Sequence, residues 1–140
     1  METLPRGSLL VRTWFGDDEA WQRLARAITV PSEDGFLADV TAVDDPAYAS
    51  LDAGRLRELT PDGPLRPSVS FLADEPALTT DGWPMQVVAL GGAQSQPFRV
   101  VATELWSVEN NLNLSNMDWI EFAEAADPDG VFRGFRLPGR

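Results

Sequence analysis

Ser8-Leu-Leu-Val-Arg-Thr-Trp-Phe15 carries the clearest indication of fold class, because its aliphatic, β-branched and aromatic residues predict a first β-strand. A helix is predicted directly after this strand. Asp17 can cap that helix, and Trp21, Leu24 and Ile28 recur at helical spacing along one face. A strand followed at once by an amphipathic helix is typical of α/β proteins.

Beyond this unit, apolar runs alternate with helical and turn segments. Further strands are predicted at 36–43, 69–73, 85–90, 98–103 and 131–135, and further helices at 52–59 and after an S-x-x-D capping box at Ser115 and Asp118. Right-handed crossovers would make the first three strands parallel, and the short turn after 85–90 favours an antiparallel hairpin. We therefore expect residues 1–140 to form a single acidic α/β domain, with a mixed, mostly parallel sheet of about 5–6 strands and about three helices covering both faces.

The composition excludes several classes of chemistry. The 140 residues include no histidine, no cysteine and no lysine, so all 11 basic residues are arginines. This excludes imidazole bases, thiolate nucleophiles, zinc–thiolate sites and Schiff-base lysines. Carboxylates, hydroxyls, amides and one tyrosine remain, which favours a binding protein over an enzyme.

The net charge of −11 at pH 7 bears on the choice of partner. Such a field repels phosphate backbones and attracts cationic surfaces, so we expect no nucleic-acid partner and a basic protein partner. The alternative is that the acidic surface serves solubility alone. The sequence shows no secretory signal and no apolar run of membrane-span length, which favours a cytoplasmic protein without a membrane partner.

Acidic residues follow each of the first three predicted strands. They are Asp17 and Asp18, then Asp44 and Asp45, then Asp74 and Glu75. Parallel strands would bring them to one sheet edge, where open α/β folds bind ligands, and carboxylate oxygens suit Mg²⁺ or Ca²⁺. The alternative treats the same residues as helix caps and turn formers, and no cofactor beyond these cations is expected.

The segment from Glu104 to Trp119 is rich in asparagine, which disfavours helix interiors. One interpretation is an irregular loop in which the amides satisfy the backbone while Leu112, Leu114 and Met117 insert into the core. The other is a ligand or partner surface of amides and aromatic rings. The candidate contact residues are Trp106, Glu109, Asn110, Asn111, Asn113 and Asn116.

Several segments together resemble a family of small bacterial proteins known only as a domain of unknown function. The resemblance lies in Leu9-Leu-Val-Arg-Thr13, Gly35-Phe-Leu-Ala-Asp39, Asp44-Asp-Pro46, the run from Glu104 to Asp118, and Gly130-Val-Phe-Arg-Gly-Phe135. It covers nearly the whole chain, and the asparagine-rich run is its most specific part. It implies one domain, and it assigns no catalytic residues.

Three hypotheses of function follow. The first is a non-enzymatic binding protein, inhibitor-like or immunity-like, that engages a basic protein. The second is a small-molecule or divalent-cation binding module, or an enzyme, that uses carboxylates such as Asp39 with the asparagine-rich segment. Asp39 either faces solvent or points inward and pairs with Arg12 or Arg99. The third is a structural protein, monomeric or homodimeric through Trp83 and the hairpin.

Overall fold

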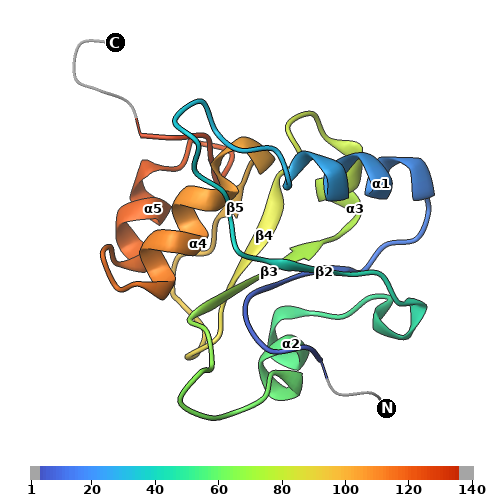
Figure 1. The fold of residues 1–140 in the computed structure, drawn as a ribbon, viewed down its shortest axis with the longest axis horizontal. Helices are drawn as coiled ribbons and strands as arrows, with labels where there is room; N and C mark the ends of the chain where they lie inside the picture. The colour runs from blue at the N-terminus through green and yellow to red at the C-terminus, as the bar shows by residue number, and fades with distance from the viewer. Residues whose placement is uncertain (1–3, 136–140) are drawn as a thin grey trace.

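The computed structural model describes residues 4–135, and the first apolar run forms a fully buried strand, β1 (Leu9–Arg12). This strand lies inside a six-stranded sheet of order β2-β1-β3-β4-β5-β6 (Figure 1). The other strands are β2 (Thr41–Val43), β3 (Val69–Ala73), β4 (Met85–Ala89), β5 (Arg99–Val100) and β6 (Val131–Phe132). The predicted third strand has the predicted bounds, and the others are shorter than predicted.

The described residues also form five α-helices and two short 3₁₀ helices. The α-helices are α1 (Asp18–Ala27), α2 (Ala53–Leu59), α3 (Glu75–Thr79), α4 (Leu105–Asn113) and α5 (Trp119–Ala125), and the 3₁₀ helices are Pro46–Tyr48 and Ala102–Glu104. Helices α1, α2 and α5 match the three predicted ones. Helices α3 and α4 are additional, and each follows an apolar strand without a long turn segment.

The sheet is mixed, as predicted. Strand β1 pairs in parallel with β2 and β3, so the prediction of three parallel strands is confirmed. Strand β4 is antiparallel to both β3 and β5, which confirms the hairpin, and β5 pairs in parallel with β6. Three of the five strand pairs are therefore parallel, in agreement with the predicted mixed, mostly parallel sheet.

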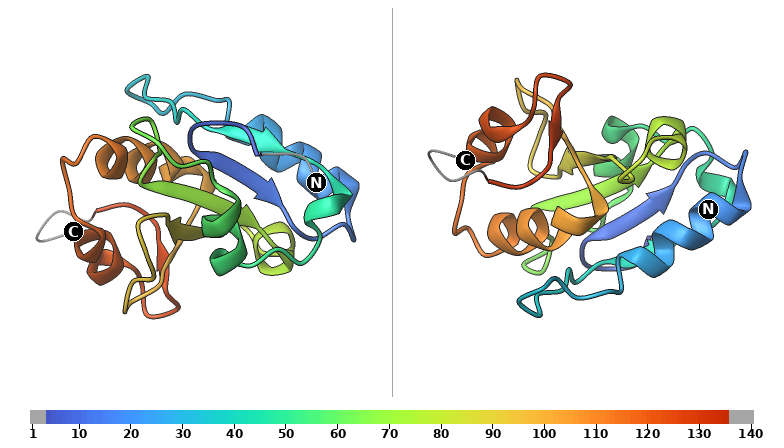
Figure 2. Two further views of the ribbon diagram at one scale, coloured as in Figure 1. Left: turned by 90° about the horizontal axis from the view of Figure 1, so that it is seen from below. Right: turned by 90° about the horizontal axis from the view of Figure 1, so that it is seen from above.

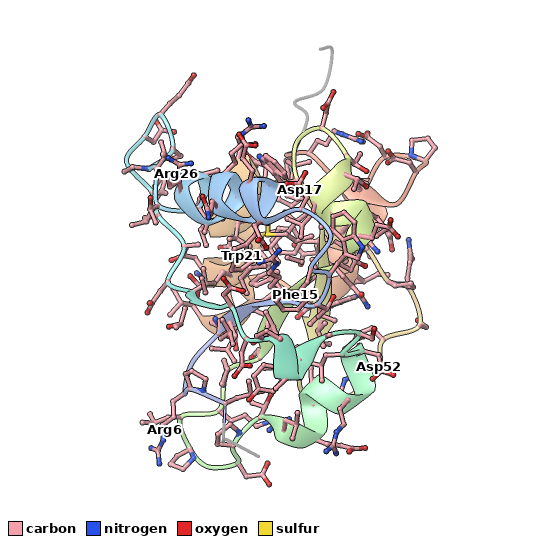
Figure 3. All side chains as sticks on the ribbon, turned by 90° about the vertical axis from the view of Figure 1, so that its right-hand side faces the viewer. Arg6, Phe15, Asp17, Trp21, Arg26 and Asp52 are labelled. Carbon is pink, nitrogen blue, oxygen red and sulfur yellow. The ribbon has the colours of Figure 1, made fainter. Side chains whose placement is uncertain are left out.

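Helices cover both faces of the sheet, because side chains along each buried strand alternate between two cores (Figure 2). Leu10 and Phe71 belong to the larger core, which lies under α1, α3, α4 and α5. Trp21 enters this core from α1 (Figure 3). Leu9 and Leu72 face the smaller core under α2. Figure 1 shows α2 on the opposite side of the sheet from α1 and α3.

Two local predictions are wrong. The run 36–43 pairs with β1 only from Thr41 onward, because the preceding residues leave the sheet to cover α4. The predicted capping box does not form, since Asp118 precedes α5 without a side-chain hydrogen bond. Ser115 instead adopts φ 57° just after α4, and its N–H donates to the Leu112 carbonyl at 3.3 Å. Ser115 therefore ends one helix and does not begin the next.

Candidate functional site

The parallel strands β1, β2 and β3 define two edges of the sheet. The carboxyl edge lies where these strands end, and the amino edge lies where they begin. The predicted acidic residues lie at the carboxyl edge. The predicted asparagine-rich segment contacts the amino edge. The two candidate sites are therefore at opposite ends of the same strands.

Arg12, the last residue of β1, is a buried cation at the carboxyl edge with 3% of its surface exposed. Its guanidinium donates to the Asp18 carboxylate at 2.7 Å and to the Asp44 carboxylate at 3.3 Å. Its Nε donates to the Trp14 carbonyl at 3.0 Å, and its guanidinium carbon lies 4.4 Å from the Phe15 ring centroid. Asp18 and Asp44 thus compensate the charge of Arg12, and Arg12 does not pair with Asp39.

Two further acids at this edge act as helix caps. Asp17 accepts a hydrogen bond from the Ala20 N–H at 3.0 Å, which confirms the predicted cap of α1. Asp45 accepts from the Ala47 N–H at 2.9 Å and caps the 3₁₀ helix that begins at Pro46. Both carboxylates therefore satisfy backbone groups that a helix start leaves unpaired.

Asp74 caps α3 and also pairs with Arg99. Its carboxylate accepts from the Ala77 N–H at 3.2 Å and from two guanidinium nitrogens of Arg99 at 2.8 and 2.7 Å. Glu75 is exposed in the first turn of α3. Across residues 4–135, no group of three or more acidic side chains is arranged to hold a metal ion. Binding of Mg²⁺ or Ca²⁺ stays a prediction, which calorimetric titration would test.

Most of the asparagine-rich segment forms helix α4, so the predicted irregular loop is wrong for residues 105–113, whereas residues 114–118 do form a turn. The amide of Asn110 donates to the Trp106 carbonyl at 2.6 Å, and that of Asn111 donates to the Ser107 carbonyl at 2.9 Å. Each side chain bonds to a carbonyl four residues earlier. The amides therefore add to the helix on its surface instead of replacing its backbone bonds.

Tertiary packing accounts for the helix where propensity does not. Leu105, Val108 and Leu112 are buried in the larger core along one face of α4. Leu112 thus inserts into the core as predicted and Met117 packs partly against it, but Leu114 is 67% exposed. Leu114 directly follows the last residue of α4 and stays outside the core.

Helix α4 joins the starts of all three parallel strands through two side chains. Glu109 accepts from the backbone N–H of Asp39, which precedes β2, at 2.6 Å. Asn113 accepts from the backbone N–H of Ser68, which precedes β3, and donates to the hydroxyl of Ser8, which precedes β1, both at 2.8 Å. The Asn113 amide also donates to the Glu109 carboxylate at 2.8 Å, so the contacts form one network.

The carboxylate of Glu109 is buried without a cation beside it. The residue is 5% exposed, and its two oxygens accept from a backbone amide and a side-chain amide, which are both neutral. None of the ion pairs within the described chain includes Glu109. Such a carboxylate is costly to bury, and hydrogen bonds offset only part of that cost.

Glu109 and Asn113 line a polar cavity of about 530 Å³, the amino-edge hollow. Its wall also includes Asp39 and Asn110, so four residues singled out in the sequence lie together there. Asp39 is exposed, as one of the two alternatives predicts. The remaining polar wall comes from Arg6, Ser8, Thr41, Arg66 and Ser68.

The other candidate contact residues lie elsewhere. Trp106 stacks on Phe36 at 4.7 Å between ring centroids and lines an apolar cavity of about 300 Å³ together with Trp83. Its indole Nε1 is buried without a hydrogen-bond partner. Asn111 and Asn116 do not line the hollow. The structure thus divides the predicted surface into a polar and an apolar part.

Sequence reasoning missed Arg6, Ser8, Arg66 and Ser68. Ser8 is the first residue of the first predicted strand and Ser68 directly precedes the third, and each stands one residue before the observed strand, a shared position that could have indicated the amino edge. Nothing near Arg6 or Arg66 in the sequence indicates a site. They reach the hollow because the chain before β1 and the loop before β3 lie beside each other.

Glu104 is the described acid whose pKa burial raises. It stands just before α4, near the end of β5, and partial burial holds the pKa of its carboxyl above the usual 4.5.

Strand β5 runs in the same direction as β3, because each is antiparallel to β4. Helix α4 therefore begins at the carboxyl edge and ends at the amino edge.

Comparison with known proteins gives a family and no activity. Among the described residues, no helix has the length and apolar character that a membrane span requires. No curated protein matches the chain. One family model matches residues 7–135, which include every segment of the predicted resemblance. The bacterial origin in that resemblance stays an expectation. The chain belongs to the family described as a domain of unknown function, DUF6924.

Proposed function

We propose that this protein is a non-enzymatic binding protein whose partner presents a basic protein surface, as an inhibitor or immunity protein would. The observation that carries the proposal is the distribution of charge. Among residues 4–135, the arginines mostly form internal contacts, either as ion pairs or, for Arg26 and Arg57, as hydrogen bonds to backbone carbonyls. The surplus of acids therefore remains for an external cation.

Helix α5 presents part of this surplus. Asp118, Glu121 and Glu124 are spaced three residues apart, are exposed, and form no ion pair within the described chain. Ile120 beside them is 43% exposed. Acidic side chains around an exposed aliphatic group favour fast encounter with a basic surface and some apolar contact after it.

A variant in which the three acidic side chains of this surface are made neutral tests the proposal. Tagged wild-type protein and the triple variant Asp118→Asn, Glu121→Gln, Glu124→Gln are used as bait in cell lysate at low and moderate salt. We expect the wild type to retain a basic protein in a salt-sensitive manner and the variant to lose it. The matched control neutralises three acids that already have arginine partners: Glu19→Gln, Glu58→Gln and Asp62→Asn.

The same experiment can overturn the proposal. If the wild type retains no salt-sensitive partner, the surface has no basic partner of this kind. If the triple variant and the control lose the partner equally, net charge is responsible and α5 is not the contact.

The buried Glu109 favours a second candidate function, a small-molecule binding module.

A further inference from the structure

We propose that the amino-edge hollow binds a small zwitterion, an aliphatic α-amino acid or the amino terminus of a short peptide. The site requires an ammonium group, a carboxylate and an apolar side chain on one ligand. The inference does not rest on the basic protein partner, because it uses different residues at a different place in the fold. It names a class of ligand for the second candidate function, the small-molecule binding module.

The anionic part of the hollow would bind the ammonium group. Glu109 is buried, and each of its oxygens accepts one hydrogen bond from a neutral group. A carboxylate offers roughly four lone-pair sites, so acceptor capacity remains on both oxygens. Asp39 lines the same cavity, and its carboxylate forms no ion pair within residues 4–135. An ammonium group between these two acids would supply the charge that Glu109 lacks.

The cationic part of the hollow would bind the ligand carboxylate. Arg66 is largely committed, because it donates to the carbonyls of Thr60 at 2.7 Å and Leu90 at 2.9 Å. Arg6 is exposed and forms no ion pair or hydrogen bond within the described chain. It lies away from α1 and beside the loop before β3 (Figure 3). Its guanidinium is suited to a bidentate contact with a carboxylate.

The charges in the hollow do not neutralise one another. Arg6 forms no ion pair with Asp39 or Glu109, although all three residues line the same cavity. A ligand with one charge would satisfy one part of the wall and leave the other unpaired. A zwitterion satisfies both, and the cavity of about 530 Å³ is within the range of roughly 300–1,000 Å³ that small-molecule sites occupy.

Two exposed leucines indicate the ligand side chain. Leu65 and Leu114 are 74% and 67% exposed, and both line the hollow beside Pro64 and Pro67. Large aliphatic side chains exposed at the wall of a polar cavity favour a ligand that brings apolar surface of its own. An aliphatic amino acid matches this wall better than a charged or strongly polar one.

The probes are L-leucine and the dipeptide Leu-Gly, each titrated into the full chain by calorimetry. We expect saturable binding of at least one, and the tighter of the two identifies a free amino acid or a peptide terminus. N-acetyl-L-leucine lacks the ammonium group and L-leucine amide lacks the carboxylate. Each is expected to bind roughly tenfold more weakly or worse.

Two variants place the binding in the hollow. Glu109→Gln and Arg6→Gln are each expected to weaken binding of the tighter probe roughly tenfold or more. Arg6 has no partner in the described fold, so Arg6→Gln keeps the test valid if Glu109→Gln does not fold. The control Arg26→Gln removes an exposed arginine from α1, and its binding should equal that of the wild type.

Three results would overturn the inference. The first is no saturable heat from L-leucine or Leu-Gly at millimolar concentration. The second is equal binding of N-acetyl-L-leucine or L-leucine amide, because the two charges would then not be recognised. The third is unchanged binding by Arg6→Gln, together with a Glu109→Gln variant that either binds as the wild type does or does not fold.

Discussion

The two edges of the parallel strands each bury one charged side chain, and they treat it in opposite ways. At the carboxyl edge, Arg12 is a buried cation compensated by two carboxylates, Asp18 and Asp44. At the amino edge, Glu109 is a buried anion held only by neutral donors. The cation at the carboxyl edge is compensated within the protein, whereas the anion at the amino edge remains available to a cationic ligand group.

Burial and acidity alone therefore do not separate structural from functional groups in this protein. Six acids gather at the carboxyl edge, but five of them serve as arginine partners or helix caps: Asp17, Asp18, Asp44, Asp45 and Asp74. At the amino edge, Glu109 belongs to the network between α4 and the strands, and it lacks such a partner. Four stability measurements can test this contrast between the edges.

The largest effect is expected from removing the compensation of Arg12. The double variant Asp18→Asn, Asp44→Asn leaves a buried guanidinium without a counter-charge, which should cost about 3 kcal/mol in the free energy of unfolding. Urea unfolding followed by tryptophan fluorescence measures it. Glu19→Gln, in an exposed pair with Arg23, is the control and should change little. Unchanged stability of the double variant would mean that the carboxylates do not compensate Arg12.

The next effect is expected within the asparagine-rich segment. Asn113→Ala removes three side-chain hydrogen bonds, to Ser68, Ser8 and Glu109, and should cost about 2 kcal/mol. Asn116→Ala is the matched control, because that side chain is exposed, and it should stay within about 0.5 kcal/mol of the wild type. The two variants are compared by urea unfolding. Equal losses of stability in the two variants would show that the hydrogen bonds of Asn113 do not stabilise the contact between α4 and the strands.

A smaller effect is expected at Asp74, which combines a cap with an ion pair. Asp74→Asn keeps the cap of α3 but removes the charge that pairs with Arg99, and it should cost about 1 kcal/mol. Asp74→Ala removes both contacts and should cost about 1 kcal/mol more. Thermal unfolding of the two variants separates the contributions. If asparagine and alanine have the same effect, the cap contributes nothing measurable.

The smallest effect is expected from Glu104. Burial raises its pKa above 4.5, so folding favours the protonated acid, and stability is lost as the pH rises from about 4.5 through the raised pKa. Glu104→Gln should therefore be slightly more stable than the wild type at neutral pH and equal to it below about pH 4. Urea unfolding at both pH values is the measurement. A difference that does not change with pH would assign the effect to packing, and Glu124→Gln serves as the exposed control.

Several elements follow from local sequence alone. The apolar run Val69–Ala73 forms a strand with the predicted bounds, because five consecutive apolar or small residues can be buried on both faces. Asp17 caps α1, as its position directly before an amphipathic run predicts. Helix α4 is the opposite case, since the propensity of its asparagines is overcome by burial of Leu105, Val108 and Leu112.

The residues of the candidate site likewise divide into those that the sequence indicates and those that it does not. Glu109, Asn110 and Asn113 could be identified from the sequence, because their density within one segment is unusual. Arg6 and Arg66 could not, because they come from segments far apart along the chain and meet only where the strands begin. The pairing of Arg12 with Asp18 and Asp44, and not with Asp39, also depends on strand order.

From residue types and their spacing alone follow the α/β class, the acidic surface and the absence of imidazole, thiol and amine chemistry. These are properties of composition and of short-range pattern, which persist in any arrangement of the chain. Which charges are compensated is a property of contacts between distant residues. The parallel pairing of β1 with β2 and the position of α1 directly after β1 bring Asp44 and Asp18 to Arg12 at one edge. The packing of α4 against the starts of the strands leaves Glu109 with neutral donors at the other edge.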